Sequence, residues 1–531
     1  MRNMELPGRS PVHAPSGMVA TSSSLASLTG INMLQRGGNA MDAAIAACAV
    51  QCVVEPASTG VGGDCFCLYS PSGSREIIAF NGSGTAPASA TADWYAMHQI
   101  KNIERQSPHS VVIPGAVDAW CQLNKDHGRL PLDELLGPAI RYAENGYPIA
   151  SRVALDLLAQ KSVVMGDENL RRVFMPTGSL PDVGEMHHQP ELAESLRKIA
   201  RDGRDAFYSG EIADDIVTYL QSKGGLHTLA DFQGYSGEYV VPISTKFRNF
   251  EIFECPPNGQ GVIALMLMNI MNLMDPGHMR LNSIEHYHLE IEAGKLAYRD
   301  RDLYISDPAY NEVPVKSLLS PEYAKELLTQ INPTKANTEL PLINGSAHPD
   351  TVYISVVDEE RNCCSFINTL FEGFGSGLMS PKSGIVLTNR AQGFVLDPMH
   401  PNCIGPKKRP LHTIIPGMVC KDGKVVMPFG VMGGQYQAFG HMNFLTRFID
   451  YKLDIQEAQD SPRLFPDPEN GTVEVESGIP GDVIEGLKSL GHKVVQATKP
   501  IGGSQAIWVD WEAGILTGGS ESRKDGCAIG Y

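Results

Sequence analysis

The chain has 531 residues, of which 42% are hydrophobic and 19% are charged, and its formal net charge is -17 at pH 7. This length exceeds the size at which single cores stop growing, so we expect two domains or one large layered domain. The acidic balance, without a basic block, argues against a nucleic acid or an anionic membrane as partner. Residues 1–17 lack the apolar stretch of a secretory signal, which predicts a cytoplasmic protein.

The cysteines and the short motifs give no support for a metalloenzyme. Eleven cysteines are present, an odd number without the paired CxxC or Cys/His spacing of a zinc site. We therefore expect buried free thiols. The sequence contains neither the HExxH motif of zinc hydrolases nor the GxSxG motif of serine hydrolases.

The N-terminal part of the chain predicts two helices followed by two strands. The helical patterns are rich in alanine, the first begins near residues 22–24, and a glycine pair at 37–38 separates them. The glycines at 60–63 follow a helix rather than a strand and lack the last spaced glycine, so we reject a dinucleotide-binding loop. Strand patterns follow at 65–69 and 76–80.

Residues 111–335 have mostly helical patterns. One segment in this region brings His286, His288, Glu290 and Glu292 close together in the sequence. As metal ligands they would have to share one helix face and leave an open coordination position. We expect instead a solvent-exposed helix face with paired charges.

The C-terminal part begins with a polar, turn-rich stretch at 332–349, which predicts an exposed linker accessible to cleavage. Strand patterns follow directly at 352–358 and 363–369. Three further strands are expected at 385–387, 423–427 and 507–509, and one helix is expected at 440–452. Strands and helices mixed in this way predict layered sheets covered by helices.

Thr351 lies where the linker meets the first of these strands. A threonine hydroxyl is a weak nucleophile unless a base lies beside it. A threonine at a new N-terminus carries such a base, because the ordinary pKa of an α-amino group is about 7.7 to 8.0. Cleavage of the bond between Asp350 and Thr351 would therefore create a catalytic residue. Without that cleavage, Thr351 would be an ordinary strand residue.

A series of ordered motifs runs along nearly the whole chain. The first half contains GMVAT, RGGNAMDAA, VGGD, VIPGAV, PPNGQGVIAL and YRDRDLYISDP, and the second half contains DTVYISVVD, FGSGLMSPKSGIVLTN, GPKKRPLHTIIP, GVMGGQYQ and SESRKDGCAIGY. These motifs resemble those of the gamma-glutamyltranspeptidase family. The resemblance implies an α+β fold, a four-layer αββα sandwich of the N-terminal-nucleophile hydrolase type. It also implies one self-cleavage, after which the fragments 1–350 and 351–531 stay intertwined as a heterodimer; a higher oligomer is left open.

The resemblance further implies catalytic roles. Thr351 would attack first the carbonyl of Asp350 and later the substrate amide, forming an acyl-enzyme. Thr369 would hold Thr351 by a hydrogen bond. Gly433 and Gly434 would form an oxyanion hole from main-chain N–H groups. This chemistry requires no cofactor and no metal ion, because the amine of Thr351 moves the proton and the main chain holds the oxyanion.

The positions that would bind the head of a γ-glutamyl substrate depart from the family pattern. Such a head needs an arginine for its carboxylate and an acid for its ammonium group. The arginine position is filled by Ser83 or Thr85, depending on alignment, and the acidic pair by Gln392-Gly393. The ammonium group of a γ-glutamyl substrate would therefore have no obvious partner. Gly393 remains one of the residues predicted to bind substrate.

Other residues predicted to bind substrate have changed as well. Phe371 replaces an asparagine, and His412-Thr413 replace a serine pair. Arg390 takes the place of a glutamine beside Asn389. Its guanidinium could hold a carboxylate or a carbonyl-rich acyl group in a bidentate fork, or it could form a structural salt bridge, and both interpretations stay open.

These replacements resemble the branch of the family that includes cephalosporin-acylase-like proteins and oxamate amidohydrolase. We expect an autoprocessed hydrolase of a small-molecule amide, with hydrolysis rather than transfer to an amino acid acceptor. The family's usual substrates are γ-glutamyl compounds such as glutathione, and the alternative is a smaller or non-amino acyl amide. The alternative from another class is a folded relative that never cuts itself. Val352, in place of the commoner second threonine, leaves room for that alternative.

Overall fold

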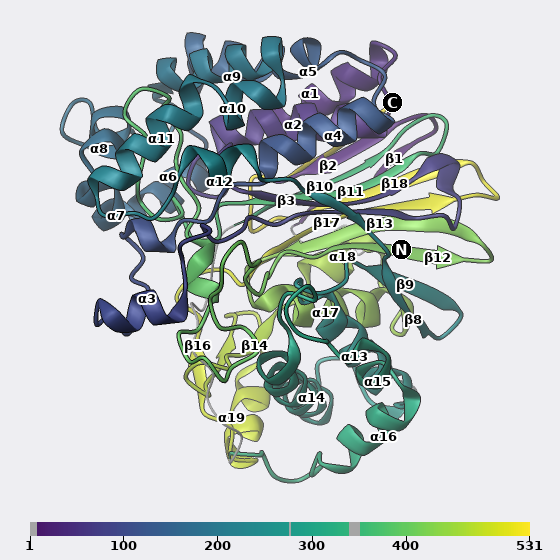
Figure 1. Cartoon of the computed structure of the whole chain (residues 1–531). Helices are drawn as coiled ribbons and strands as arrows, with labels where there is room; N and C mark the ends of the chain where they lie inside the picture. Colours follow the sequence, from purple (N-terminus) through teal and green to yellow (C-terminus); the bar gives the residue numbers. More distant parts are fainter. Residues whose placement is uncertain (1–7, 276–277, 339–350) are drawn as a thin grey trace.

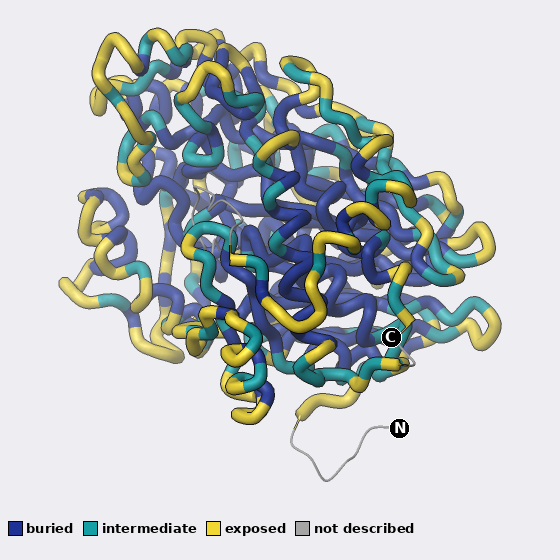
Figure 2. The backbone as a smooth tube through the Cα atoms, turned by 90° about the horizontal axis from the view of Figure 1, so that it is seen from below, coloured by how far each residue is buried: buried dark blue, intermediate teal, exposed yellow. Residues whose placement is uncertain are grey.

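Two seven-stranded sheets lie face to face in the centre of the molecule, and helices cover the outer face of each sheet (Figure 1). This computed structural model describes residues 8–275, 278–338 and 351–531. Figure 2 shows that the buried stretches gather in the middle of the molecule and that exposed turns surround them. The predicted α+β fold, a four-layer αββα sandwich, is confirmed.

The first sheet contains the strand that begins directly after Thr351. Its strands, in spatial order, are β19 (Cys527–Gly530), β2 (Met18–Thr21), β10 (Val352–Val357), β11 (Cys363–Thr369), β3 (Asp64–Ser70), β4 (Ile78–Gly82) and β7 (Glu238–Val240). Its outer face is covered by α1 (Ser24–Gln35), α2 (Ala40–Val54) and α4 (Ala116–His127). The two N-terminal helices and the strands around Thr351 therefore form where the sequence predicts them.

The second sheet lies against the first and carries the glycine pair at the end of one strand. Its strands, in spatial order, are β1 (Val12–Ala14), β18 (Ile515–Ser520), β17 (Gly503–Asp510), β13 (Lys424–Met432), β12 (Pro416–Lys421), β9 (Phe250–Glu254) and β8 (Ile243–Phe247). Its outer face is covered by α13 (Gly261–Asn272), α17 (Tyr436–Ile449) and α18 (Ile455–Asp460). The patterns at 423–427, 507–509 and 440–452 thus correspond to β13, β17 and α17.

The predicted strand at 385–387 is wrong. In the described chain this segment makes only isolated bridges, from Leu387 to Gly62 and from Val386 to Met379. Its apolar residues are buried by packing between loops, which a short apolar run cannot distinguish from burial in a sheet.

Further helices lie outside these layers. Helices α5 (Leu132–Asn145) and α9 (Pro190–Asp202) pack outside α2, and α14 (Ile284–Tyr304) packs outside α13. The other elements are α3 (Ala92–Met97), α6 (Ser151–Ala159), α7 (Lys161–Gly166), α8 (Glu168–Phe174), α10 (Arg204–Tyr208), α11 (Glu211–Ser222), α12 (Leu229–Gln233), α15 (Val315–Leu318), α16 (Pro321–Thr329), α19 (Gly481–Ser489), the pair β5 (Tyr147–Pro148) and β6 (Met186–His187), the small sheet β14 (Leu464–Pro466), β15 (Val473–Val475) and β16 (Val494–Gln496), and the short turns η1 (Pro71–Gly73), η2 (Pro108–Ser110) and η4 (Arg390–Gly393). Residues 111–335 are mostly helical as predicted, with β7, β8 and β9 among the strands that interrupt them.

The predicted linker at 332–349 is described only as far as residue 338, and residues 332–338 contain no helix or strand. Asp350 lies outside the described residues.

Side chains of the central strands point alternately to the two faces of the first sheet, and each face contributes to a different apolar cluster. Strand β10 pairs antiparallel with β11, and Tyr353 lies opposite Ile367. Both of these side chains belong to the apolar cluster between the sheets, whereas Ile354 belongs to the cluster beneath α1 and α2. Because successive side chains of a strand point to opposite faces, Thr351 and Thr369 also point between the sheets.

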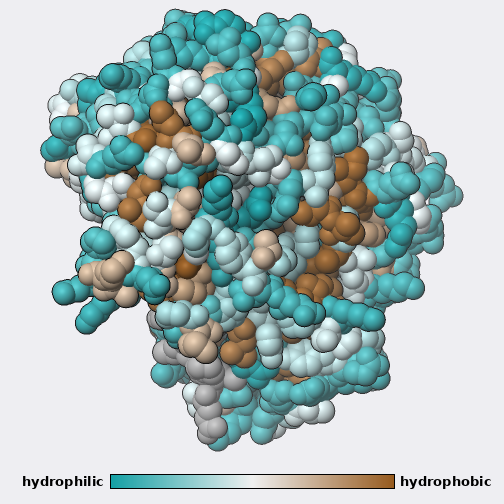
Figure 3. Space-filling model, in the orientation of Figure 1, coloured by the Kyte–Doolittle hydropathy of each residue, from teal (hydrophilic) through white to brown (hydrophobic). Residues whose placement is uncertain are grey.

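The visible surface is mixed in polarity, as expected for a chain with 42% hydrophobic residues. In Figure 3, apolar side chains on the visible face form separate patches among hydrophilic ones. Within the described ranges, no helix has both the length and the apolar character needed to cross a bilayer.

All eleven cysteines lie in the described chain as free thiols, and all except the partly buried Cys121 and Cys527 are buried. The prediction of buried free thiols is therefore confirmed for nine of the eleven.

Candidate active site

Thr351 and Thr369 lie at adjoining ends of β10 and β11. The register that pairs Val352 with Asn368, continued by one residue, places the two threonines opposite each other. Their Oγ1 atoms are 3.2 Å apart, and both residues are buried. Thr369 Oγ1 also accepts a hydrogen bond of 2.9 Å from the N–H of Phe371, whose φ of 81° is uncommon for an aromatic residue. The loop after β11 therefore holds the Thr369 hydroxyl beside that of Thr351.

Gly433 and Gly434 join β13 to α17. Their φ angles are 116° and 57°, a region that glycine enters without steric cost. A Cβ on Gly433 would lie 2.8 Å from the Cα of Gly502, so the close approach of two main-chain segments excludes a side chain there. The glycine pair thus lets the chain turn sharply from the second sheet into the helix.

The carbonyls of this turn are directed into α17. Gly433 O accepts from the N–H of Tyr436 at 3.1 Å, and Gly434 O accepts from the N–H of Gln437 at 3.2 Å. The C=O and N–H of a trans peptide point in opposite directions. The N–H groups of Gly434, one of the two predicted donors, and of its neighbour Gln435 therefore point out from the start of the helix, where the helix dipole also favours negative charge. This geometry suits stabilisation of an oxyanion.

Arg390 is a fully buried cation with an incomplete set of partners. Its Nη1 donates to Thr413 Oγ1 at 3.1 Å, and its Cζ lies 3.8 Å from the centroid of the Phe371 ring. Asp64 Oδ2 lies 3.8 Å from Nε, which is too far for a hydrogen bond. Nε and Nη2 have no hydrogen-bond partner among the described residues. Burial lowers the pKa of Arg390 to about 9, although the negative charges of Asp64 and Glu372 oppose this shift. Because a pKa of about 9 lies above neutral pH, the guanidinium stays charged there.

Asp64 is a site residue that the sequence analysis missed. Its Oδ1 accepts from the N–H of Gly84 at 2.8 Å, and its Oδ2 lies 3.0 Å from His412 Nε2. His412 Nδ1 accepts from the N–H of Ile414 at 3.3 Å, so Nε2 carries the proton and donates to Asp64. Burial and the nearby Arg390 lower the pKa of His412 to about 4, although Asp64 opposes the shift. His412 is therefore neutral, and the charge of Asp64 is balanced by Arg390.

The remaining predicted residues shape the loops around Arg390. Asn389 Oδ1 accepts from the N–H of Glu372 at 3.1 Å, and its Nδ2 donates to Gln392 Oε1 at 2.6 Å. Asn389 therefore ties the loop after β11 to η4. Gly393 ends η4, and its carbonyl accepts from the side chain of Asn402. These contacts are structural, and the described residues give Gly393 no role at the threonine pair.

The segment where the family pattern has an arginine reaches the site through Gly84, whose N–H binds Asp64. Ser83 Oγ accepts from Asn258 Nδ2 at 3.0 Å. Thr85 forms an isolated main-chain bridge with Ile113. Neither side chain replaces the charge of an arginine.

The predicted solvent-exposed face on α14 is wrong. His286, His288, Glu290 and Glu292 are all buried. Glu290 forms an ion pair of 2.8 Å with Arg447 of α17. Parts of the chain that are distant in sequence cover this helix, and the periodicity of the segment alone cannot show them.

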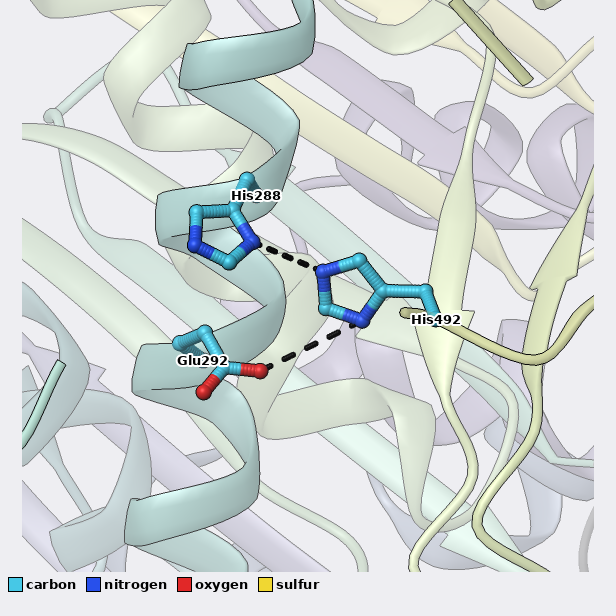
Figure 4. A group of neighbouring side chains, drawn as sticks. All are labelled: His288, Glu292 and His492. Atoms are coloured by element: carbon cyan, nitrogen blue, oxygen red, sulfur yellow. Dashed lines mark hydrogen bonds and ion pairs between the residues drawn. The ribbon is translucent and has the colours of Figure 1, made fainter. Parts of the chain in front are cut away.

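Among the described residues, one group has ligand atoms close enough to hold a metal ion: His288, Glu292 and His492 (Figure 4). Lys295 Nζ lies 3.4 Å from His492 Nδ1 and 2.8 Å from Glu292 Oε1. His492 Nε2 lies 2.7 Å from His288 Nδ1, and His288 Nε2 lies 2.7 Å from the carbonyl of Asn332. Burial, Lys295 and His288 together lower the pKa of His492 to about 3. A chain of hydrogen bonds from Lys295 to the carbonyl of Asn332 thus involves all four ring nitrogens of His288 and His492, and the positive charge of Lys295 opposes a bound cation.

Comparison with known proteins gives a consistent result. Residues 26–531 match the family model described as Gamma-glutamyltranspeptidase. The Glutathione hydrolase-like YwrD proenzyme of Bacillus subtilis (strain 168) is 36% identical, over 97% of this chain and 98% of its own. The Oxamate amidohydrolase proenzyme of Klebsiella pneumoniae subsp. pneumoniae is 31% identical, over 97% of this chain and 98% of its own. The crystal structure of cephalosporin acylase from Bacillus halodurans has a TM-score of 0.92 and 38% identity, covering 100% of this chain and 99% of that one.

Proposed function

Because the chain belongs to the gamma-glutamyltranspeptidase family, we propose that it is a proenzyme that cuts itself before Thr351 and then hydrolyses a small-molecule amide through an acyl-threonine intermediate. The chain is an enzyme of this family, whose named relatives are hydrolases and acylases. The observation that carries the proposal is the buried contact of 3.2 Å between the hydroxyls of Thr351 and Thr369. The intact threonine pair argues against a non-catalytic relative.

Self-cleavage needs only the chain itself and water. Thr351 Oγ1 attacks the carbonyl carbon of Asp350, so that a C–O bond forms and the peptide C–N bond breaks. The nitrogen takes the proton that leaves the hydroxyl and becomes a free α-amino group. Water then hydrolyses the ester and leaves fragments of 350 and 181 residues.

Turnover uses the same hydroxyl with the new amine as base. The amine takes the proton of Thr351 Oγ1 as this oxygen attacks the substrate amide, and it passes the proton to the leaving amine. The N–H groups at the start of α17 stabilise the oxyanion. Water, deprotonated by the same amine, then attacks the ester carbonyl. The bond between the acyl carbon and Thr351 Oγ1 breaks, Oγ1 takes the proton from the amine, and the acid leaves. An α-amino pKa of about 7.7 to 8.0 suits a base near neutral pH.

Arg390 supports an acyl group that carries a carboxylate. Its buried Nε and Nη2 lack partners in the described chain, and a carboxylate would accept hydrogen bonds from both. A γ-glutamyl head would also need an acid for its ammonium group. Asp64 is bound to His412, and Glu372 forms an ion pair of 3.0 Å with Arg105. A dicarboxylic monoamide therefore fits best, and glutathione is the second candidate because a relative at 36% identity is named glutathione hydrolase-like.

The test is release of amine or ammonia by the processed protein from glutathione, oxamate, succinamate and glutaramate. A kcat/KM for one of the three monoamides at least about tenfold above that for glutathione is the expected result. The reverse order would overturn the assignment of the acyl group. A fully processed protein that hydrolyses no amide in a wider panel would overturn the proposed activity.

A further inference from the structure

The loop between β9 and α13 runs beside the segment that carries two predicted substrate-binding residues. The N–H of His412 donates to the carbonyl of Asn258 at 2.9 Å, and the N–H of Gln260 donates to the carbonyl of His412 at 2.9 Å. These two bonds align the loop with residues 412–413 and bring the buried Gln260 next to the site.

The side-chain amide of Gln260 holds two main-chain carbonyls at once. Its Nε2 lies 2.8 Å from the carbonyl of Thr413 and 3.0 Å from the carbonyl of Gly434. A primary amide has two N–H donors, so each carbonyl receives one. Gln260 Oε1 lies 3.4 Å from Arg301 Nη1, which orients the amide with its nitrogen toward the two carbonyls.

These two carbonyls belong to the two halves of the proposed site. Holding the carbonyl of Gly434 fixes the plane of the peptide between Gly434 and Gln435, which directly follows the N–H of Gly434, one of the two predicted oxyanion donors. Holding the carbonyl of Thr413 places the residue whose hydroxyl binds Arg390 Nη1 at 3.1 Å. Gln260 therefore connects the oxyanion turn to the arginine that would bind the acyl carboxylate.

We propose that Gln260 is a positioning residue for amide hydrolysis: it sets the oxyanion turn at Gly434 and the Arg390 partner Thr413 in one mutual geometry. This inference rests on the proposed function. Gln260 would belong to the large fragment, whereas Thr413, Gly434 and Arg390 would belong to the small one. The large fragment would thus complete a site whose nucleophile lies on the small fragment.

The test replaces Gln260 with methionine, which has a similar length but no donor. The matched control is Gln189→Met, because Gln189 is also buried and its Nε2 donates to the carbonyl of Val53 at 2.8 Å and lies 3.1 Å from the hydroxyl oxygen of Tyr147, outside the site. Both variants and the wild type are assayed after complete processing. The readouts are kcat, KM, thermal stability and the affinity for a boronic acid analogue that forms a tetrahedral adduct with Thr351 Oγ1.

For Gln260→Met we expect kcat to fall about 10- to 100-fold with KM within about threefold, because a displaced oxyanion donor acts mainly on the transition state. Affinity for the boronic acid should fall by about the same factor as kcat. Gln189→Met should lose stability but keep kcat within about twofold. Equal losses of kcat in both variants, or an unchanged kcat in Gln260→Met, would overturn the inference.

A second variant keeps the shape of the side chain in case Gln260→Met does not fold. In Gln260→Glu, a carboxylate oxygen replaces the amide nitrogen and faces two carbonyl oxygens, so kcat relative to wild type should be low at pH 8. That deficit should shrink at lower pH, because protonation restores one donor. A deficit independent of pH would count against the inference. A wild-type chain that neither cuts itself nor hydrolyses any amide would overturn the proposed function and this inference with it.

Discussion

Replacing Arg390 with methionine removes a buried charge and its donors from the position proposed to bind the acyl carboxylate. In the described chain, Nε and Nη2 of Arg390 are buried and lack hydrogen-bond partners, so a carboxylate that reached them would accept a hydrogen bond from each. A hydrogen bond that involves a charged group is worth about 1.5 to 3 kcal/mol, so the loss of two corresponds to about 3 to 6 kcal/mol. The expected loss in kcat/KM is therefore about 10²- to 10⁴-fold for a substrate with an acyl carboxylate.

The assay compares two substrates on two enzymes. Processed wild type and Arg390→Met are each given a dicarboxylic monoamide and the same amide with its carboxylate replaced by a carboxamide. The large loss should appear only with the carboxylate substrate, and Arg390→Lys should recover only part of it, because an ammonium group offers no bidentate fork. The same loss with both substrates would refute carboxylate binding and leave Arg390 as a structural residue.

Further predictions concern the hydroxyl pair, the glycine turn and acid stability. Thr369→Val should slow both self-cleavage and kcat by about 10- to 100-fold, whereas Thr369→Ser should keep most of both; an active valine variant would exclude the positioning role. Gly433→Ala should lower the free energy of unfolding by about 1 to 3 kcal/mol, because its φ is 116°. Urea denaturation measures this change, and an equal midpoint would contradict it. Stability should also fall as the pH drops from about 6.5 toward 4, because the unfolded chain then binds more protons than the folded one; a urea midpoint independent of pH in this window would refute this. Four buried histidines cause this loss of stability. Burial lowers the pKa to about 4 in His187, His227 and His412 and to about 3 in His492.

The fold and the hydroxyl pair could be predicted because ordered family motifs run along nearly the whole chain. Local strand patterns predict the strands that begin after Thr351 and end at Thr369, and the resemblance adds the contact between the two hydroxyls. Asp64 could not be found in this way. It lies opposite Thr369 only because β3 pairs with β11. Gln260 likewise reaches the site through a loop that lies far from Thr351 in the sequence.

The sequence left the role of Arg390 open between a salt bridge and a substrate contact. Among the described residues, the carboxylate that pairs with Arg390 is that of Asp64, which lies 3.8 Å from Nε and is hydrogen-bonded to His412 instead. Choosing between a salt bridge and a substrate contact requires interatomic distances, which a sequence pattern does not provide. The buried face of α14 was missed for the same reason, because Arg447 and His492 reach it from the C-terminal part of the chain.

The most direct test of the account is the intact mass, under denaturing conditions, of freshly purified wild-type protein beside Thr351→Ala. The account predicts two wild-type fragments of 350 and 181 residues, separated between Asp350 and Thr351, and one uncut chain for the variant. A wild-type chain that stays whole after prolonged incubation would contradict the threonine mechanism.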